Sequence, residues 1–358
     1  MNCRTCGAEI PEGARFCEHD GTPVAAPTAG NAPPANADAG RRPGCACGQL
    51  ADDGEGYCAA CGEPITHVDT DLSPALGATT DIGLVHKTNQ DALAVAAAQV
   101  GAAPAFVLVV CDGVSAAQGS ERSSRLAAAC IRDHILAFLA DETLPQLAPE
   151  ALVERSSTAI ETALHAADAA VRAMPSSARD VLDPPTTTAV AALAIGDALT
   201  ISWAGDSRAY SVAPDGDVQL LTHDDSWINE EVDQGAMDLS TAMADPDAHA
   251  ITNWLGIQQD ETGAEVPATV HVAAYTAPPG ALLVLCSDGL WNYLGSPDHL
   301  ARLIHSQPGA STAGDVARAL VDFAIGLGGR DNISVAVAAL DGSRVSNPSE
   351  MRIPSEGH

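Results

Sequence analysis

The stretch AFVLVVCDGV, residues 105–114, joins a run of seven apolar residues to an Asp-Gly pair. An apolar run of this length, bounded by turn-forming residues, is typical of a buried β-strand. Asp112 would then lie where the strand ends, at the rim of a sheet. Similar runs, flanked by Gly, Asp or Pro, occur at 188–195, 198–205, 281–286 and 333–340. The sequence therefore predicts strands at all five places.

Helical periodicity separates these strands into blocks. Apolar residues return every three or four positions in 121–140, 149–173 and 312–327, which predicts three helices. Because strands and helices do not alternate one by one, the pattern favours an α+β fold over a doubly wound parallel sheet. We expect one large domain at 79–341 and a disordered tail at 342–358.

Five aspartates of the large domain share one kind of setting, either directly after an apolar run or in a glycine-marked turn: Asp91, Asp112, Asp206, Asp288 and Asp331. A single Asp-Gly pair usually marks a turn. Five such residues in one domain point instead to carboxylates gathered at a sheet edge, where they suit hard cations such as Mg²⁺ or Mn²⁺. Without a neutralising cation, the mutual repulsion and desolvation of so many carboxylates in one cleft would cost much free energy.

The order of short motifs resembles the metal-dependent protein phosphatases, the PPM or type 2C class, over roughly 79–340. The matching segments are 81–83 (DIG), 89–91 (NQD), 112–113 (DG), 186–188 (TTT), 205–208 (GDSR), 287–289 (SDG) and 331–332 (DN). The resemblance implies a four-layer α-β-β-α sandwich of two antiparallel sheets, with metal ions in a channel at one edge.

The resemblance also implies ligands for two or three Mn²⁺ or Mg²⁺ ions. Asp112 would bridge two ions. Asp288 and Asp331 would complete the coordination of these ions, and the Gly113 carbonyl would add one more oxygen ligand. Asp91 would act directly or through bound water. Asp206 would share a third, weaker site with Asp288.

The reaction implied is hydrolysis of phosphoserine or phosphothreonine by a water that bridges two metals and attacks phosphorus directly. Asp112, Asp288, Asp331 and His86 are its candidate catalytic residues. His86 stands where most relatives hold the phosphate with arginine, which offers a permanent charge that a histidine side chain in general does not. Gln90 replaces the usual glutamate, which predicts weaker metal affinity. Val114 replaces a histidine of eukaryotic members, so water would protonate the leaving group.

Seven of the ten cysteines precede Gly62, and their spacing suits metal better than disulfides. In 45–64, the ligands Cys45, Cys47, Cys58 and Cys61 match a closed tetrahedral zinc site. In 1–21, the candidate ligands are Cys3, Cys6 and Cys17, with His19 or Asp20 as the fourth. We therefore expect two small zinc-ribbon-like modules that together hold one or two structural Zn²⁺ ions. The expected role of these modules is to bind a protein partner. A Pro/Ala-rich linker at 22–44 and a second linker at 65–78 complete this organisation.

Charge and hydropathy restrict the partners further. Lys and Arg total 17 against 47 Asp and Glu, a formal net charge of −30, which repels duplex nucleic acid and anionic membranes. No run is long enough to span a bilayer, and the first residues lack a secretion signal, so a cytoplasmic location is expected. The expected partners are phosphorylated proteins, the substrates of a serine/threonine kinase. The rival hypothesis is an inactive phosphatase-like scaffold that acts through its ribbons.

Overall fold

Two antiparallel sheets organise the computed structural model, which describes residues 58, 62, 65–114, 119–174, 184–242, 245, 248, 250–259, 262–307 and 309–341. The first sheet has six strands, in the order β1 (His67–Ser73), β2 (Leu76–Asp81), β13 (Ile333–Ala339), β12 (Leu282–Cys286), β7 (Arg208–Val212) and β8 (Val218–Leu220). The second has five, in the order β11 (His271–Thr276), β6 (Ala198–Ala204), β5 (Ala189–Ile195), β4 (Ala103–Cys111) and β3 (Ala92–Val100).

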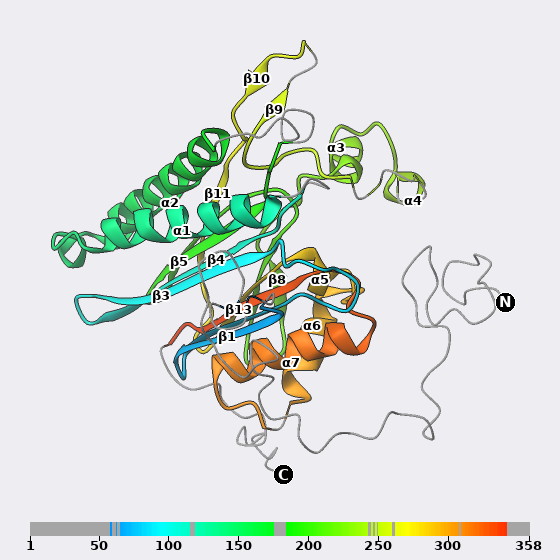
Figure 1. Cartoon of the computed structure of the whole chain (residues 1–358). Coiled ribbons are helices and arrows are strands. Elements are labelled where there is room, and N and C mark those ends of the chain that lie inside the picture. Colours follow the sequence, from blue (N-terminus) through cyan, green and yellow to red (C-terminus); the bar gives the residue numbers. More distant parts are fainter. Residues whose placement is uncertain are drawn as a thin grey trace, which may run out of the picture.

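Helices cover the outer face of each sheet. On the five-stranded sheet lie α1 (Ser120–Leu139) and α2 (Pro149–Arg172), and on the six-stranded sheet lie α6 (Pro297–His305) and α7 (Ala313–Gly326) (Figure 1). The short elements are η1 (Leu144–Gln146), α3 (Trp227–Asp233), α4 (Leu239–Ala242), β9 (Gln258–Gln259), β10 (Glu265–Val266) and α5 (Asp288–Trp291). The order of layers is therefore helix, sheet, sheet, helix, as expected.

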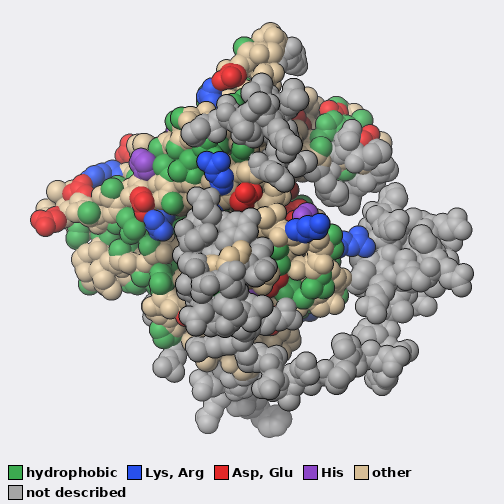
Figure 2. All heavy atoms as spheres, in the orientation of Figure 1, with side chains coloured by type: hydrophobic (Ala, Val, Ile, Leu, Met, Phe, Trp, Pro, Cys, Tyr) green, Lys and Arg blue, Asp and Glu red, His purple; other side chains and the backbone are tan. Residues whose placement is uncertain are grey.

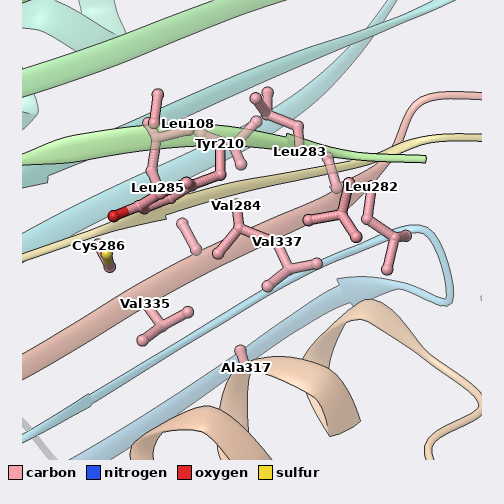
Figure 3. Close-up of a cluster of buried hydrophobic side chains, with 14 of the residues drawn as sticks. Leu108, Tyr210, Leu282, Leu283, Val284, Leu285, Cys286, Ala317, Val335 and Val337 are labelled. Carbon is pink, nitrogen blue, oxygen red and sulfur yellow. The ribbon is translucent and has the colours of Figure 1, made fainter. Parts of the chain in front are cut away.

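The main core lies between the two sheets and under α7. Figure 3 shows Leu108 of β4, Tyr210 of β7, Leu283 of β12, Val335 of β13 and Ala317 of α7 in one buried cluster. The inner strands are apolar on both faces, since each sheet carries helices on its far side. This burial explains the unbroken apolar runs at 188–195, 281–286 and 333–340.

The predicted elements lie where periodicity placed them. The five expected strands coincide with β4, β5, β6, β12 and β13, and the three expected helices coincide with α1, α2 and α7. Thr312 caps the start of α7 by accepting a hydrogen bond from the backbone N–H of Asp315, and the Asp315 side chain accepts from the Thr312 backbone. This capping box fixes the start of the helix.

The prediction of a linker at 65–78 is wrong, because β1 and most of β2 occupy these residues. β2 pairs with β13 through Asp81 and Ile333, so the domain begins before Thr79. Polar residues of β1 are held by ion pairs, including His67 with Asp81 at 2.8 Å and Asp71 with Arg318 at 2.9 Å. A strand stabilised in this way lacks the apolar pattern that reveals a buried strand.

The predictions for the N-terminal modules lie outside the described residues, apart from Cys58 and Gly62. Cys58 is buried and packs with Ile65 and Val68. The other predicted zinc ligands, and the tail at 342–358, also lie outside the described part: Cys3, Cys6, Cys17, His19, Asp20, Cys45, Cys47 and Cys61.

On the face shown in Figure 2, basic and acidic side chains are interspersed over the described surface. No helix in the described ranges combines the length and apolarity that crossing a membrane requires.

Candidate metal centre

The five predicted aspartates lie at strand ends of both sheets. Asp112 follows β4 and Asp206 follows β6, while Asp91 directly precedes β3. In the other sheet, Asp288 opens α5 after β12, and Asp331 lies two residues before β13. Asp112 interacts electrostatically with the other four, so the side chains gather at one edge of the paired sheets. The structure thus brings together residues that are up to 240 positions apart.

Burial and mutual repulsion disfavour the ionised form of these carboxyl groups. Burial is the larger cause and raises the pKa of Asp91 to about 7, with the charges of Asp288 and Asp331 adding to the effect. Burial and the charge of Asp288 likewise raise the pKa of Asp206 to about 8. The pKa of Asp112 is raised well above its usual value for the same reasons. A cluster of this kind gains stability from any cation that binds it.

Unpartnered oxygens indicate what kind of ligand would fit. Oδ1 of Asp91, Oδ1 of Asp206 and Oδ1 of Asp288 are buried and have no hydrogen-bond partner. A buried carboxylate oxygen without a partner is costly, and Mn²⁺ or Mg²⁺ prefers such hard oxygen ligands. Among the described residues, no three His, Cys, Asp or Glu side chains already converge on one point. The aspartates are therefore neighbours whose unpartnered buried oxygens have the ligand chemistry of a divalent-cation site.

A serine anchors the other oxygen of Asp91. The Ser287 hydroxyl donates to Asp91 Oδ2 at 2.7 Å, and its oxygen accepts from the backbone N–H of Ser334 at 3.0 Å. Ser287 thereby joins the end of β12 to β13 and to the carboxylate. Asp91 is left with one free oxygen that points in a fixed direction.

Asn332 holds the loop that precedes Asp91. Its amide nitrogen donates to the carbonyl oxygens of Ile82, at 2.8 Å, and Thr88, at 3.2 Å. Its amide oxygen accepts from the backbone N–H of Gln90 at 2.7 Å. Three hydrogen bonds from one side chain thus fix the path of residues 82–90 beside Asp331.

The threonine motif positions Asp112. The backbone N–H of Thr188 donates to the Asp112 carbonyl at 2.7 Å, and the Asp112 N–H donates to Thr188 Oγ1 at 3.2 Å. The Thr188 hydroxyl also hydrogen-bonds Ser207 at 2.8 Å. Gly113 is packed so closely that a Cβ would lie 2.9 Å from the Gln90 carbonyl oxygen, which explains the glycine.

A fixed positive charge lies near Asp206. The Arg208 guanidinium donates to both carboxylate oxygens of Asp224, with 2.6 Å between Nη2 and Oδ2. It also lies over the Trp291 ring, with 3.7 Å from its central carbon to the ring centroid. The Arg208 charge favours ionisation of Asp206 and partly offsets the repulsion from Asp288.

His86 lies beside one of the predicted ligands. Its Nε2 is 3.4 Å from Asp331 Oδ1, and the two side chains are 40% and 47% exposed. The neighbouring Lys87 is also exposed. The predicted phosphate contact is therefore at the rim of the aspartate cluster, where a substrate can reach it.

Asp168, a buried residue of α2 that holds a distant segment, is absent from the residues that the sequence pattern predicts. Its Oδ1 accepts from the Gly256 N–H at 2.9 Å, and its Oδ2 accepts from the Ala268 N–H at 3.4 Å. Asp168 thereby holds both ends of the segment that contains β9 and β10, between Gly256 and Ala268. The available signal was an acid on the apolar face of a helix, four residues after the buried Leu164.

Comparison with known sequences gives a family match. A sequence model described as "Protein phosphatase 2C" matches residues 85–323. The serine/threonine protein phosphatase PstP of Mycobacterium tuberculosis H37Rv is 29% identical over 261 residues, which is 73% of this chain and 44% of the relative. A putative 2C-type protein phosphatase of Streptococcus pyogenes is 30% identical over 151 residues, 42% of this chain and 56% of the relative. The chain therefore spans about half the length of these curated relatives.

Comparison with solved structures also finds serine/threonine phosphatases. The crystal structure of the Mycobacterium tuberculosis phosphatase PstP/Ppp has a TM-score of 0.55 and 26% identity, covering 77% of this chain and 99% of the other. The catalytic domain of PstP in complex with two manganese ions has a TM-score of 0.52 and 27% identity, covering 76% and 99%.

Proposed function

Because the chain belongs to the protein phosphatase 2C family, we propose that it hydrolyses phosphoserine and phosphothreonine in proteins. The observation that carries this proposal is the set of three buried, unpartnered oxygens on Asp91, Asp206 and Asp288 at one edge of the sheets. The relatives named as serine/threonine phosphatases support the substrate class. Proteins phosphorylated by a serine/threonine kinase are the proposed substrates.

Asp112, Asp288 and Asp331, with the carbonyl of Gly113, are the proposed ligands of two Mn²⁺ or Mg²⁺ ions. Asp91 would complete this set, and Asp206 with Asp288 would hold a third ion. The manganese in the PstP structure supports this choice of metals. When bound, such ions would supply a more acidic water as nucleophile and neutralise charge on the phosphoryl oxygens.

The chain's own residues orient this centre and the substrate. Ser287 fixes one oxygen of Asp91, and Asn332 fixes the loop that carries His86. His86 is the proposed hydrogen-bond donor to a phosphoryl oxygen, since it is exposed beside Asp331. Val114 offers no proton, so solvent would protonate the leaving alkoxide.

The proposal is tested with purified protein and a phosphothreonine peptide, with and without Mn²⁺. We expect metal-dependent turnover in the wild type and in Asp197→Asn, an exposed acid in the turn between β5 and β6. Asp112→Asn and Asp288→Asn should lose turnover, and titration calorimetry should show weaker Mn²⁺ binding by both. Absence of turnover with any divalent metal would favour the inactive scaffold.

For the N-terminal region, Cys45, Cys47, Cys58 and Cys61 are the proposed ligands of one structural Zn²⁺. Their spacing, two close pairs of cysteines within 17 residues, supports this assignment. Zinc in this module would leave the surface of the ribbon available to a protein partner. Metal analysis of the full chain, compared with a Cys45→Ser/Cys47→Ser variant, should show the loss of one equivalent of zinc.

A further inference from the structure

Two large apolar side chains are exposed side by side at the rim of the aspartate cluster. Leu84 is 63% exposed and Val85 is 66% exposed, and they directly precede His86. Among the described residues, the other exposed large hydrophobics are Leu72 and Leu126, each isolated in the sequence. Single exposed leucines are ordinary on protein surfaces, whereas an adjacent pair beside a candidate site is typical of a contact surface.

The loop holds this pair in place. The Leu84 N–H donates to the Gly329 carbonyl at 2.7 Å, and the Gly83 N–H donates to Asp81 Oδ1 at 2.8 Å. The Asn332 side chain fixes the loop from within through the Ile82 carbonyl. After the pair, the Asn332 side chain also donates to the Thr88 carbonyl at 3.2 Å. Because the backbone is held before and after Leu84 and Val85, the exposure of the pair belongs to the folded conformation.

Leu84 also lies close to the proposed metal ligands. A Cβ placed on Gly329 would be 3.1 Å from Leu84 Cγ, so the leucine side chain lies over Gly329, two residues before Asp331. His86 contacts Asp331 from the same loop. Leu84 and His86 are two residues apart, which limits the distance between their Cα atoms to about 7 Å.

The charge around the pair is unlike that of the whole chain. Residues 82–90 contain no acid, although the chain has a net charge of −30. His86 and Lys87 of this loop are exposed, as is the nearby Arg330. A surface that combines two apolar side chains with these basic groups is complementary to a phosphorylated segment that carries an apolar side chain.

Building on the proposed phosphatase activity, we propose that Leu84 and Val85 form an apolar subsite for the substrate. The subsite contacts a large aliphatic side chain within about two residues of the phosphorylated serine or threonine, a range set by the two-residue separation of Leu84 from His86. The enzyme would therefore prefer phosphopeptides with leucine, isoleucine or valine at one of these positions.

The test uses phosphothreonine peptides with a serine background and a single leucine at position −2, −1, +1 or +2. We compare three proteins: wild type, the double variant Leu84→Ser/Val85→Ser and the control Leu72→Ser. For each protein, kcat/KM on every peptide is divided by the rate of the same protein on p-nitrophenyl phosphate. This division cancels differences in folding and metal content. Leu72 is 50% exposed and lies near the β1–β2 turn, at the far end of β1 from the His67–Asp81 pair.

We expect wild type to favour leucine over serine at one position by about fivefold, as partial burial of an aliphatic side chain allows. The preference should fall below about twofold in the double variant and persist in Leu72→Ser. Equal rates for all peptides in wild type, or an unchanged preference in the double variant, overturn the subsite alone. Absence of turnover on p-nitrophenyl phosphate and every peptide overturns the phosphatase proposal and the subsite with it.

Discussion

The Ser287 hydroxyl donates a hydrogen bond of 2.7 Å to Asp91 Oδ2, joining residues 196 positions apart. Both residues are buried, and the same serine oxygen accepts from the Ser334 N–H. One small side chain therefore connects the end of β12, the strand β13 and a proposed metal ligand. Its loss would leave two buried polar groups without partners.

We predict that Ser287→Ala lowers the free energy of unfolding by about 1–3 kcal/mol, the usual cost of unsatisfied buried groups. Urea unfolding monitored by circular dichroism measures this loss. Ser211→Ala is the matched control, because Ser211 is buried but its hydroxyl has no hydrogen-bond partner. Equal destabilisation of the two variants would show that the Ser287 hydrogen bond has no special role.

The central elements could be predicted from sequence because their burial is complete. Strands such as β5 and β13 are buried at every position and so read as unbroken apolar runs. β1 could not be recognised, since its alternate residues His67, Asp69 and Asp71 are polar. The Arg318 side chain that pairs with Asp71 is 247 positions further along the chain. Long-range ion pairs leave no local pattern, so the sequence alone predicts a domain that begins at residue 79, whereas β1 begins at His67.

The ion pairs of β1 give a prediction about pH. Burial alone would lower the pKa of His67, but hydrogen bonds and charges from Asp69 and Asp81 outweigh it and raise the pKa to about 9. A pKa raised by folding means that protonated His67 stabilises the native state. This contribution is fully present below the unfolded pKa of about 6.5 and is lost as pH rises through about 9.

We therefore expect the stability difference between wild type and His67→Gln to shrink between pH 6.5 and about 9. The total change should be of order 2–3 kcal/mol. Urea midpoints of both proteins at pH 6, 7.5 and 9.5 measure it. A difference that stays constant across this range would contradict a charged His67 in the native state.

In the candidate site, the five aspartates can be predicted from the sequence, whereas the role of Asp168 cannot. The aspartates could be found because each follows a strand or turn in a fixed order of motifs. Asp168 and its hydrogen bonds to Gly256 and Ala268 could not, because the contact depends on how α2 packs against a distant loop. A lone acid on an apolar helix face signals a buried partner without identifying it.

We predict that Asp168→Ala frees the segment it holds. Two buried N–H groups, of Gly256 and Ala268, would lose their acceptor, at a cost of about 1–3 kcal/mol. Hydrogen exchange at these two amides should become faster, while exchange in β4 stays unchanged. Glu161→Ala, an exposed acid on the same helix, is the control and should leave exchange at both amides unaltered.

Stability and metal binding make opposite demands on the Asp112 side chain. Burial and the charges of four neighbouring aspartates raise the pKa of Asp112 in the folded protein. At a pH above the ordinary pKa of an aspartate, the unfolded chain is therefore ionised more easily than the folded one, and this difference opposes folding. Asp112→Asn removes this charge and should therefore raise the free energy of unfolding in EDTA at pH 8. In excess Mn²⁺, however, wild type should gain about 2.7 kcal/mol when the free metal is a hundredfold above its Kd.

The order of stability should therefore reverse between the two buffers, with Asp112→Asn more stable in EDTA and wild type more stable in Mn²⁺. Asp197→Asn should follow wild type in both, because this acid is exposed in the β5–β6 turn. Thermal and urea unfolding of the three proteins provide the comparison. A wild type that is more stable than Asp112→Asn in EDTA would mean that repulsion among the aspartates is already relieved by the fold. The unpartnered oxygens would then no longer argue for a divalent cation.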